Sequence, residues 1–170
     1  GHPALYEKSR AVTTDELLLL RSLVEDLNDS LLAWQKRYGY GSAIAAPQIG
    51  VLKRVVYLYT NAPVILLNPM LLFPGEERIT VLDDCLCAPG LLVKVQRYQT
   101  CPLRYRNLDW QEREVQLQED LAALIQHEAD HLDGILMPMR AVDAQSFYMD
   151  GRKPGLVEAA GAEAAPVDGT

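Results

Sequence analysis

The sequence predicts an α+β fold: short antiparallel strands packed around a central helix that carries a His-Glu-x-x-His motif, with a second long helix near the N-terminus. Three observations lead to this prediction. Two segments, one early and one late in the chain, have the apolar spacing of amphipathic helices. Short segments rich in β-branched, aromatic and aliphatic residues lie between them. The 170 residues suffice for one well-buried core, so a single domain is expected.

The first helix is predicted over residues 15–38. Apolar residues recur in this segment at spacings of three and four and therefore form one stripe along a helix. These residues are Leu20, Leu23, Leu27, Leu31 and Trp34. Thr13 and Glu16 have the spacing of a capping box, and Gly39 stands where helix C-termini are usually closed. We expect this helix to be a scaffold element of the core.

The strands and the second helix follow a stretch, 39–48, that is rich in turn-forming residues. Strands are predicted over 54–59, 64–67, 78–82, 91–97, 103–107 and 114–118. The second helix is predicted over 119–134, where Leu121, Leu124 and Ile125 mark a buried face. Gly134 provides its C-terminal stop.

The end of the chain differs in composition from the rest. The domain is predicted to end near residue 150. Residues 151–170 are dominated by Ala, Gly, Pro and Glu and predict a weakly ordered tail, in which 156–163 could form a short helix.

Charge and cysteine content narrow the class of protein. Lys and Arg total 16 against 23 Asp and Glu, a net charge of -7, which argues against direct nucleic-acid binding because it repels phosphate backbones. The 3 cysteines are an odd number at uneven spacing, unlike a secreted disulfide framework. No apolar run approaches the roughly 18–20 residues of a membrane span. A cytoplasmic location without membrane contact is therefore predicted.

The most informative residues are His127-Glu128-Ala129-Asp130-His131. On a helix, positions i and i+4 lie one turn apart on the same face, so both imidazoles can reach one metal ion. Glu128 projects beside them, near a water molecule on that metal. This spacing is the one that metal-assisted hydrolysis requires, and it favours a metallohydrolase over the alternative of two histidines on a helix surface.

A catalytic metal of this type usually has three protein ligands and one open position. One class of metallopeptidases has a third His six residues after the second one, but this position is Met137 here. Another class uses a downstream Glu as the third ligand, but Glu158 and Glu163 lie in the tail. Neither class therefore fits this sequence. A cysteine thiolate remains as the third ligand. Cys85 and Cys87 are the candidates, and their residue type and spacing do not choose between them.

Three segments resemble the peptide deformylase family, in the family's order and with natural spacing. Residues 41–48 (GSAIAAPQ) are similar to its G-x-G-x-A-A-x-Q segment, 83–87 (DDCLC) to its E-G-C-L-S segment, and 126–134 (QHEADHLDG) to its Q-H-E-x-D-H-L-x-G segment. The likeness extends from about residue 1 to residue 140. The resemblance implies a divergent family member, with a single deformylase-like catalytic domain over 1–150 and a tail over 151–170.

The resemblance implies a role for each matching residue of the metal site. Cys85, His127 and His131 would be the metal ligands, which decides between the two cysteines. Glu128 would be the general base that takes a proton from the attacking water and later delivers it to the departing amine. The cofactor would be one divalent ion, Fe2+ in the first place, with Zn2+, Ni2+ or Co2+ able to occupy the same site.

The resemblance also implies an oxyanion site and a reaction. Gln48 and the backbone N–H of Leu86 would donate hydrogen bonds to the developing oxyanion. We expect Gly41, Ile44 and Leu124 to contribute to substrate binding, because they lie in the first matching segment or one turn before the first histidine. For Ile44 and Leu124 a place in the core is an equal alternative. The reaction would remove the N-formyl group from an N-terminal formyl-methionine of a peptide and release formate. Docking on the ribosome through a basic tail, as in some family members, is not expected, since no Lys or Arg follows residue 153.

The chain departs from the family pattern around the expected site. Ala43 and Asp84 replace glycines, Cys87 replaces a serine, and Asp83 replaces a glutamate that pairs with an arginine in the family. Arg97 stands at the corresponding position, so a shorter version of that pair could form. Because these changes alter the walls of the site, two alternatives are open: a hydrolase acting on a different N-acyl substrate, and a non-catalytic member that binds a metal or a peptide.

Overall fold

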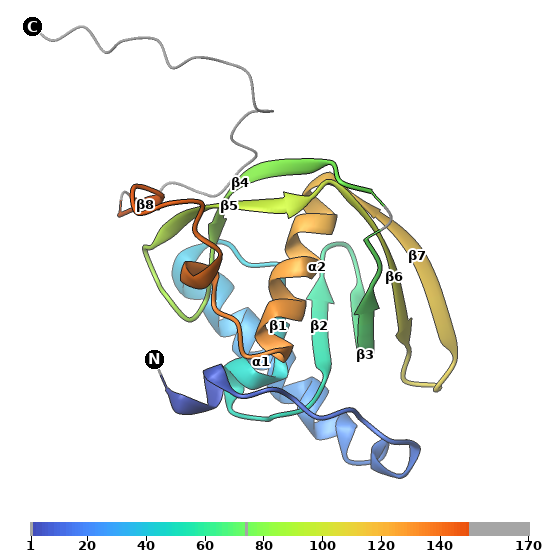
Figure 1. Ribbon diagram of the computed structural model, residues 1–170. Coiled ribbons are helices and arrows are strands. Elements are labelled where there is room, and N and C mark those ends of the chain that lie inside the picture. Colours follow the sequence, from blue (N-terminus) through green and yellow to red (C-terminus); the bar gives the residue numbers. More distant parts are fainter. Residues whose placement is uncertain (1, 74, 150–170) are drawn as a thin grey trace, which may run out of the picture.

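The computed structural model describes residues 2–73 and 75–149, and this part of the chain forms two antiparallel sheets and two α-helices (Figure 1). The predicted α+β class is confirmed. The predicted tail, with its short helix over 156–163, lies outside the described residues. Within the described part, no helix is long and apolar enough to cross a membrane.

The larger sheet has five strands in the order β1-β2-β3-β6-β7. Their bounds are Ala43–Ala45, Val55–Tyr59, Pro63–Leu71, Thr100–Arg106 and Glu112–Gln118. The smaller sheet has the order β4-β5-β8, with bounds Arg78–Asp84, Leu92–Tyr98 and Phe147–Tyr148. Each of the six predicted strands is present within a few residues of its expected bounds, whereas β1 and β8 are absent from the prediction.

Strand β1 lies inside the stretch predicted to form turns. Ala43 pairs with Leu58 and Ala45 pairs with Val56, in antiparallel register. Alanine has little preference for strands, so the sequence carries only a weak strand signal here. Burial accompanies the extended conformation, since every residue of β1 is at most 2% exposed.

Strand β3 continues past Leu67, where the prediction ends it. The pair Asn68-Pro69 is a turn signal, but Asn68 adopts a φ of 51° at a register shift, after which pairing with β6 resumes at Met70. The Asn68 side chain also hydrogen-bonds both backbone groups of Val12, at 2.8 and 2.9 Å. A residue that reads as a strand end therefore ties the N-terminal segment to the sheet.

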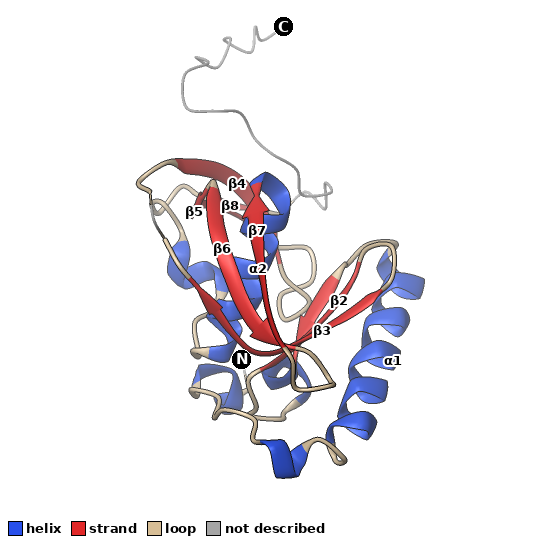
Figure 2. Cartoon of the chain, turned by 90° about the vertical axis from the view of Figure 1, so that its right-hand side faces the viewer, coloured by secondary structure: helices blue, strands red, loops and turns tan. Residues whose placement is uncertain are grey.

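The larger sheet is covered on both faces by helices. Helix α1, Leu20–Tyr38, packs with Ile44 and Tyr57 in one core cluster, and helix α2, Glu119–Leu132, packs with Ala45 and Val56 in another. Successive strand residues thus face opposite helices, as the two-residue period of a strand requires. Figure 2 shows α1 on the outer side of β2 and β3.

Helix α1 begins at Leu20, five residues after its predicted start at residue 15. The carboxylate of Glu16 accepts the N–H of Thr13 at 3.0 Å, as a capping box requires, but the box belongs to a short 3₁₀ turn, Thr14–Glu16. The four leucines of the predicted stripe are at most 8% exposed. Gly39 closes the helix with a φ of 79°.

Helix α2 runs between the two sheets and contacts strands of both (Figure 1). Nine of its 14 residues are buried, as expected for a central helix. The prediction that Leu121 lies on the buried face is wrong: it is 39% exposed, whereas Ala122 and Ile125 face the core. The predicted stop at Gly134 is confirmed, because φ is 72° there and a Cβ would lie 2.5 Å from the carbonyl oxygen of Tyr6.

Candidate metal centre

Two histidines of α2 and a cysteine at the end of β4 converge in the interior. His127 and His131 lie one turn apart on α2, and Cys85 directly follows the last residue of β4. Nε2 of His131 lies 3.2 Å from Nε2 of His127 and 3.2 Å from Sγ of Cys85. All three residues are at most 4% exposed. The geometry thus brings together the three residues expected as metal ligands.

The donor set fits one metal ion. With metal–nitrogen distances of about 2.0–2.1 Å and metal–sulfur distances of about 2.3 Å, neighbouring ligands of a tetrahedral site lie about 3.3–3.6 Å apart, close to the observed separations. Among residues 2–73 and 75–149, no other group of His, Cys, Asp and Glu meets a comparable geometry. Three protein ligands leave a coordination position open, as in catalytic rather than structural sites.

Asp83 orients the first histidine. Its Oδ2 lies 2.9 Å from Nδ1 of His127, which holds the proton on Nδ1 and leaves Nε2 to face the other two ligands. Burial by itself would lower the pKa of His127, but the charge and hydrogen bond of Asp83 raise it to about 9. A bound cation opposes this rise, because an imidazole that ligates a metal is neutral. Burial would likewise raise the pKa of Asp83, but His127 and Arg97 lower it to about 2. Asp83 is therefore anionic at neutral pH.

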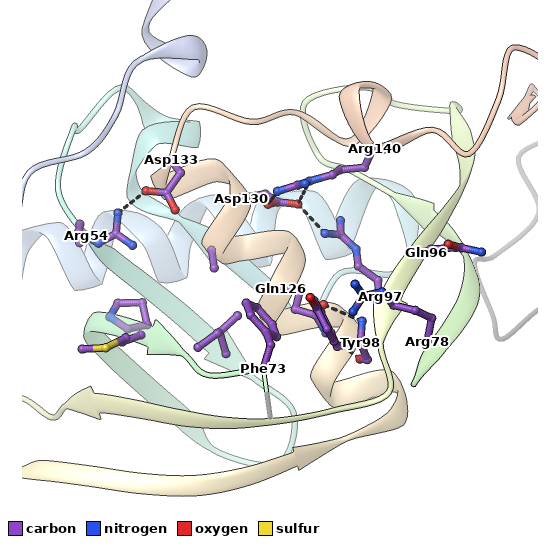
Figure 3. Close-up of a pocket in the computed structure, with 14 residues that line it drawn as sticks. Arg54, Phe73, Arg78, Gln96, Arg97, Tyr98, Gln126, Asp130, Asp133 and Arg140 are labelled. Atoms are coloured by element: carbon purple, nitrogen blue, oxygen red, sulfur yellow. Dashed lines mark hydrogen bonds and ion pairs between the residues drawn. The ribbon is translucent and has the colours of Figure 1, made fainter. Parts of the chain in front are cut away.

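A chain of alternating charges runs from Asp83 to the surface. The expected pair with Arg97 is confirmed, because Nη2 of Arg97 lies 2.9 Å from Oδ2 of Asp83. Nη1 of Arg97 donates to Asp130, which Arg140 binds through two nitrogens at 2.7 and 3.2 Å (Figure 3). Asp130 and Arg140 were not singled out in the sequence. The sequence offers one signal for Asp130, its position inside the segment 126–134 that contains His127, and none for Arg140.

Glu128 is a buried carboxyl group beside the ligands. It is 3% exposed, and its Oε2 has no hydrogen-bond partner among the described residues. Burial raises its pKa to about 7. A carboxyl group that titrates near neutrality can both accept a proton and return it.

Gln48 presents its amide to the thiols. It lies in the 3₁₀ turn after β1, and its Oε1 accepts the N–H of Ala45 at 2.7 Å. Its Nε2 lies 3.8 Å from Sγ of Cys85 and 3.6 Å from Sγ of Cys87. Leu86, the other expected oxyanion donor, directly follows Cys85, and its side chain packs against the core cluster of α1.

The two neighbouring cysteines differ in their surroundings. Sγ of Cys85 groups with the histidines, whereas Cys87 lies outside that group and donates its backbone N–H to Sγ of Cys85 at 3.4 Å. The contact with Cys87 and burial raise the pKa of Cys85, and the same contact lowers the pKa of Cys87 to about 7. A bound cation would lower the pKa of Cys85, because a coordinating thiol is deprotonated.

The structure shows what Ala43 and Asp84, two departures from the family pattern, contact in this chain. Ala43 has no positive φ and is 2% exposed in a core cluster, so its methyl group introduces no left-handed backbone strain. Asp84 is half-buried, and burial together with the charge of Asp83 raises its pKa to about 6. Asp84 therefore adds a polar, titratable group next to Cys85.

The residues expected to bind substrate lie in different environments. The side chain of Ile44 is 2% exposed in the core cluster of α1, and Leu124 is half-buried against the core cluster of α2. Gly41 precedes β1 with a φ of 113°, and a Cβ there would lie 3.1 Å from Cδ1 of Trp34. Their part in substrate binding stays a prediction, and for Ile44 such a part would fall to the backbone.

Comparison with known proteins identifies the family. The family model described as polypeptide deformylase matches residues 1–146. The chain belongs to the polypeptide deformylase family. Peptide deformylase 1 of Prochlorococcus marinus is 40% identical over an aligned length of 174 residues, gaps included. The match covers 93% of this chain and 87% of that protein. A Brucella melitensis protein named peptide deformylase-like is 37% identical over 142 residues, which cover 81% of this chain and 82% of that protein.

Solved structures of the polypeptide deformylase family share the fold. The crystal structure of peptide deformylase from Thermotoga maritima matches with a TM-score of 0.73 and 28% identity, covering 84% of this chain and 94% of that one. The peptide deformylase of Synechococcus elongatus in complex with actinonin matches with a TM-score of 0.76 and 25% identity, covering 85% of this chain and 76% of that one. The described part of the chain therefore shares the fold of these two proteins over most of its length.

Proposed function

We propose that the chain is a metal-dependent hydrolase that removes the N-formyl group from the N-terminal formyl-methionine of peptides and releases formate. The proposal is carried by the convergence of Cys85, His127 and His131 beside the buried carboxyl group of Glu128, in a member of the polypeptide deformylase family. The enzyme class follows from the family. The roles of individual residues are our assignment.

Cys85, His127 and His131 would hold one divalent ion. When bound, the ion supplies Lewis acidity, which polarises a carbonyl group and makes water more acidic. Fe2+ is the physiological ion that we propose, and Zn2+, Ni2+ and Co2+ also suit a site of imidazole and thiolate ligands. Asp83 keeps His127 in the tautomer that presents Nε2 to the site.

Glu128 moves the proton. It accepts a proton from the water that attacks the formyl carbon, and it delivers that proton to the amine nitrogen as the C–N bond breaks. Its Oε2, which has no hydrogen-bond partner among the described residues, and its pKa of about 7 support both halves of this role. A positioned base typically contributes about 10²–10⁴-fold to the rate.

Gln48 and Leu86 would stabilise the charge that develops on the formyl oxygen. The Oε1 of Gln48 is occupied by the N–H of Ala45, so its NH₂ group is the end that faces Cys85. The backbone N–H of Leu86 would be the second donor. Each such donor is typically worth about 3 kcal/mol in the transition state.

A direct assay tests the proposed reaction. The protein is loaded with nickel or ferrous ion under anaerobic conditions, and formate release from formyl-Met-Ala-Ser is measured together with metal content. Acetyl-Met-Ala-Ser serves as the control substrate. Formate release from the formyl peptide is expected. Its absence from a fully metal-loaded protein would contradict the substrate assignment.

A second candidate is a hydrolase of the same mechanism that acts on a different N-acyl substrate. Asp84 and Cys87 favour it, because they change the polarity of the wall next to Cys85, and one relative carries the name peptide deformylase-like. A panel of acyl groups and N-terminal residues separates the two, and a strict preference for formyl-methionine excludes this candidate. A non-catalytic binding role is disfavoured, since a binding module has no need for a buried base such as Glu128.

We further propose that residues 1–150 form the catalytic domain and that the protein works in the cytoplasm. The family model, which ends at residue 146, supports the domain boundary. The cysteines of the described part are free thiols, and a thiolate ligand such as Cys85 persists best in a reducing compartment.

A further inference from the structure

A pocket with a volume of about 500 Å³ opens beside α2 (Figure 3). None of the three proposed metal ligands lines it. Its wall contains four arginines that come from widely separated parts of the chain: Arg54, Arg78, Arg97 and Arg140. In a chain with a net charge of -7, this is a local concentration of positive charge. We name it the arginine pocket.

In the described part of the chain, carboxylates compensate all but one of these arginines. The ion pairs are Arg54 with Asp133 at 2.7 Å, Arg140 with Asp130 at 2.7 Å, and Arg97 with Asp83 at 2.9 Å. Arg78 forms no ion pair within the described residues, and it is exposed. Among residues 2–73 and 75–149, one positive charge of the arginine pocket therefore has no negative partner, and its donors are accessible.

Aromatic stacking fixes the position of Arg78. Its Cζ lies 3.2 Å from the centre of the Tyr98 ring. The Tyr98 ring also stacks on Phe73, with ring centres 4.1 Å apart and planes inclined by 19°, and Figure 3 shows Tyr98 between the other two side chains. A guanidinium group stacked by its face keeps the N–H groups on its edge free to donate.

An apolar wall lies beyond Tyr98 as seen from this donor group. Phe73 is 45% exposed and Met70 is 51% exposed, and both line the arginine pocket. Exposed apolar side chains beside a single oriented charge are typical of sites that bind small molecules. The pocket thus offers a surface for an apolar group and a planar fork for an anionic one.

We propose that the arginine pocket binds a ligand that carries an oxyanion, either a carboxylate or a phosphate, on an apolar or aromatic body. Arg78 binds the oxyanion through two parallel N–H groups, a geometry that suits both kinds of anion. The body of the ligand extends along the edge of the Tyr98 ring towards Phe73. This site is separate from the proposed catalytic centre, and the inference does not rest on the proposed function.

The test uses the full chain, labelled with ¹⁵N and loaded with zinc, in an NMR titration. The probes are phenyl phosphate, phenylacetate and, as the neutral control, benzyl alcohol. Saturable shifts of the amide signals of Phe73 and Tyr98 are expected with at least one of the two anions, and the tighter anion identifies the oxyanion. Shifts confined to the amides around Cys85, no saturable shifts, or equally tight binding of benzyl alcohol would overturn the proposal.

Variants locate the binding group. Arg78→Gln is expected to weaken anion binding about tenfold, because it removes a charge-assisted pair of hydrogen bonds. Arg78→Lys keeps the charge but loses the planar fork. Its affinity for the anion should therefore lie between that of the unmodified protein and that of Arg78→Gln. Arg21→Gln, an exposed position on α1, has the same change of charge and should bind as the unmodified protein does. The spectrum of each variant reports whether it is folded, and full affinity in a folded Arg78→Gln protein would contradict the inference.

Discussion

Asp83 is a single carboxylate that serves two neighbours of the metal centre. Its Oδ2 lies 2.9 Å from the ring of His127 and 2.9 Å from the guanidinium group of Arg97. These partners keep its pKa at about 2, against the effect of burial. An aspartate at the position of the family's glutamate therefore preserves the ion pair, although the side chain is one methylene shorter.

Glu128 provides the sharpest test of the residue roles. Glu128→Gln keeps the shape of the side chain but cannot accept a proton, so kcat is expected to fall about 10²–10⁴-fold while metal content is unchanged. Both quantities are measured on the same sample. Asp120→Asn, an exposed change on the same helix, is the control and should keep both. Unchanged turnover in the Glu128 variant would contradict the assignment of the base.

The two cysteines can be separated by metal content. Cys85→Ala is expected to release the metal, because it removes the one sulfur that groups with His127 and His131. Cys87→Ala should retain one metal ion per chain. Elemental analysis after loading and dialysis compares the two variants. The reverse pattern would mean that the wrong thiol has been assigned.

At the scale of elements, the spacing of apolar residues predicts where a helix lies better than it predicts where the helix begins. The leucine stripe of α1 is buried as its spacing predicts, yet the helix starts five residues later than predicted. The capping box at Thr13 signals a helical turn without specifying its length. In α2 the predicted buried face is correct at Ile125 but wrong at Leu121, which is exposed while the neighbouring Ala122 is buried. Small residues at a close contact carry little hydrophobic signal.

The buried face of α1 can be tested by a matched pair of substitutions. Leu27 is 0% exposed and Leu32 is 48% exposed, on the same helix. Leu27→Ala is expected to lower the free energy of unfolding by about 2–5 kcal/mol, because it leaves a cavity in the core. Leu32→Ala should change it by no more than about 0.5 kcal/mol. Urea unfolding measures both, and equal losses would contradict this placement of the helix.

At the scale of the whole molecule, one helix serves both the core and the chemistry. Helix α2 contacts strands of both sheets and carries two proposed metal ligands on a face different from the one that lines the arginine pocket. Asp130, in the wall of that pocket, is linked through Arg97 and Asp83 to His127. The two sites are therefore joined by a continuous series of ion pairs and a hydrogen bond.

Metal removal is expected to destabilise the fold, because the proposed ligands join α2 to the end of β4. A ligand that binds only the native state stabilises it by about 4 kcal/mol at 1,000 times its Kd. Thermal unfolding with and without a chelator measures the difference, and re-addition of zinc should restore the midpoint. An unchanged midpoint in a protein shown to have lost its metal would contradict the link between the site and the fold.

Removal of residues 151–170 is expected to leave the domain intact. The three core clusters and the metal centre are built from residues of the described part. A chain that ends at residue 150 should keep the denaturant midpoint and the metal content of the full chain. A lower midpoint would show that the removed segment contributes to folding and would move the domain boundary.

The sequence by itself determined the features that local spacing encodes. These are the apolar stripe of α1, the six strands rich in β-branched and aromatic residues, and the two histidines one turn apart. The motif segments added the family, and with it the expectation that Cys85 rather than Cys87 joins the histidines. Such features are predictable because neighbouring residues along the chain are also neighbours on one helix or strand.

Only the tertiary structure decided what depends on contacts between distant residues. Strand β1 is extended between two buried layers although its alanines favour no strand, and Asn68 continues β3 through a register shift. The link from Asp130 to Arg97, and the absence of an ion pair at Arg78 within the described residues, arise where separate elements meet. Long-range packing sets the register of strands and the neighbours of each charge, so no local pattern could reveal them.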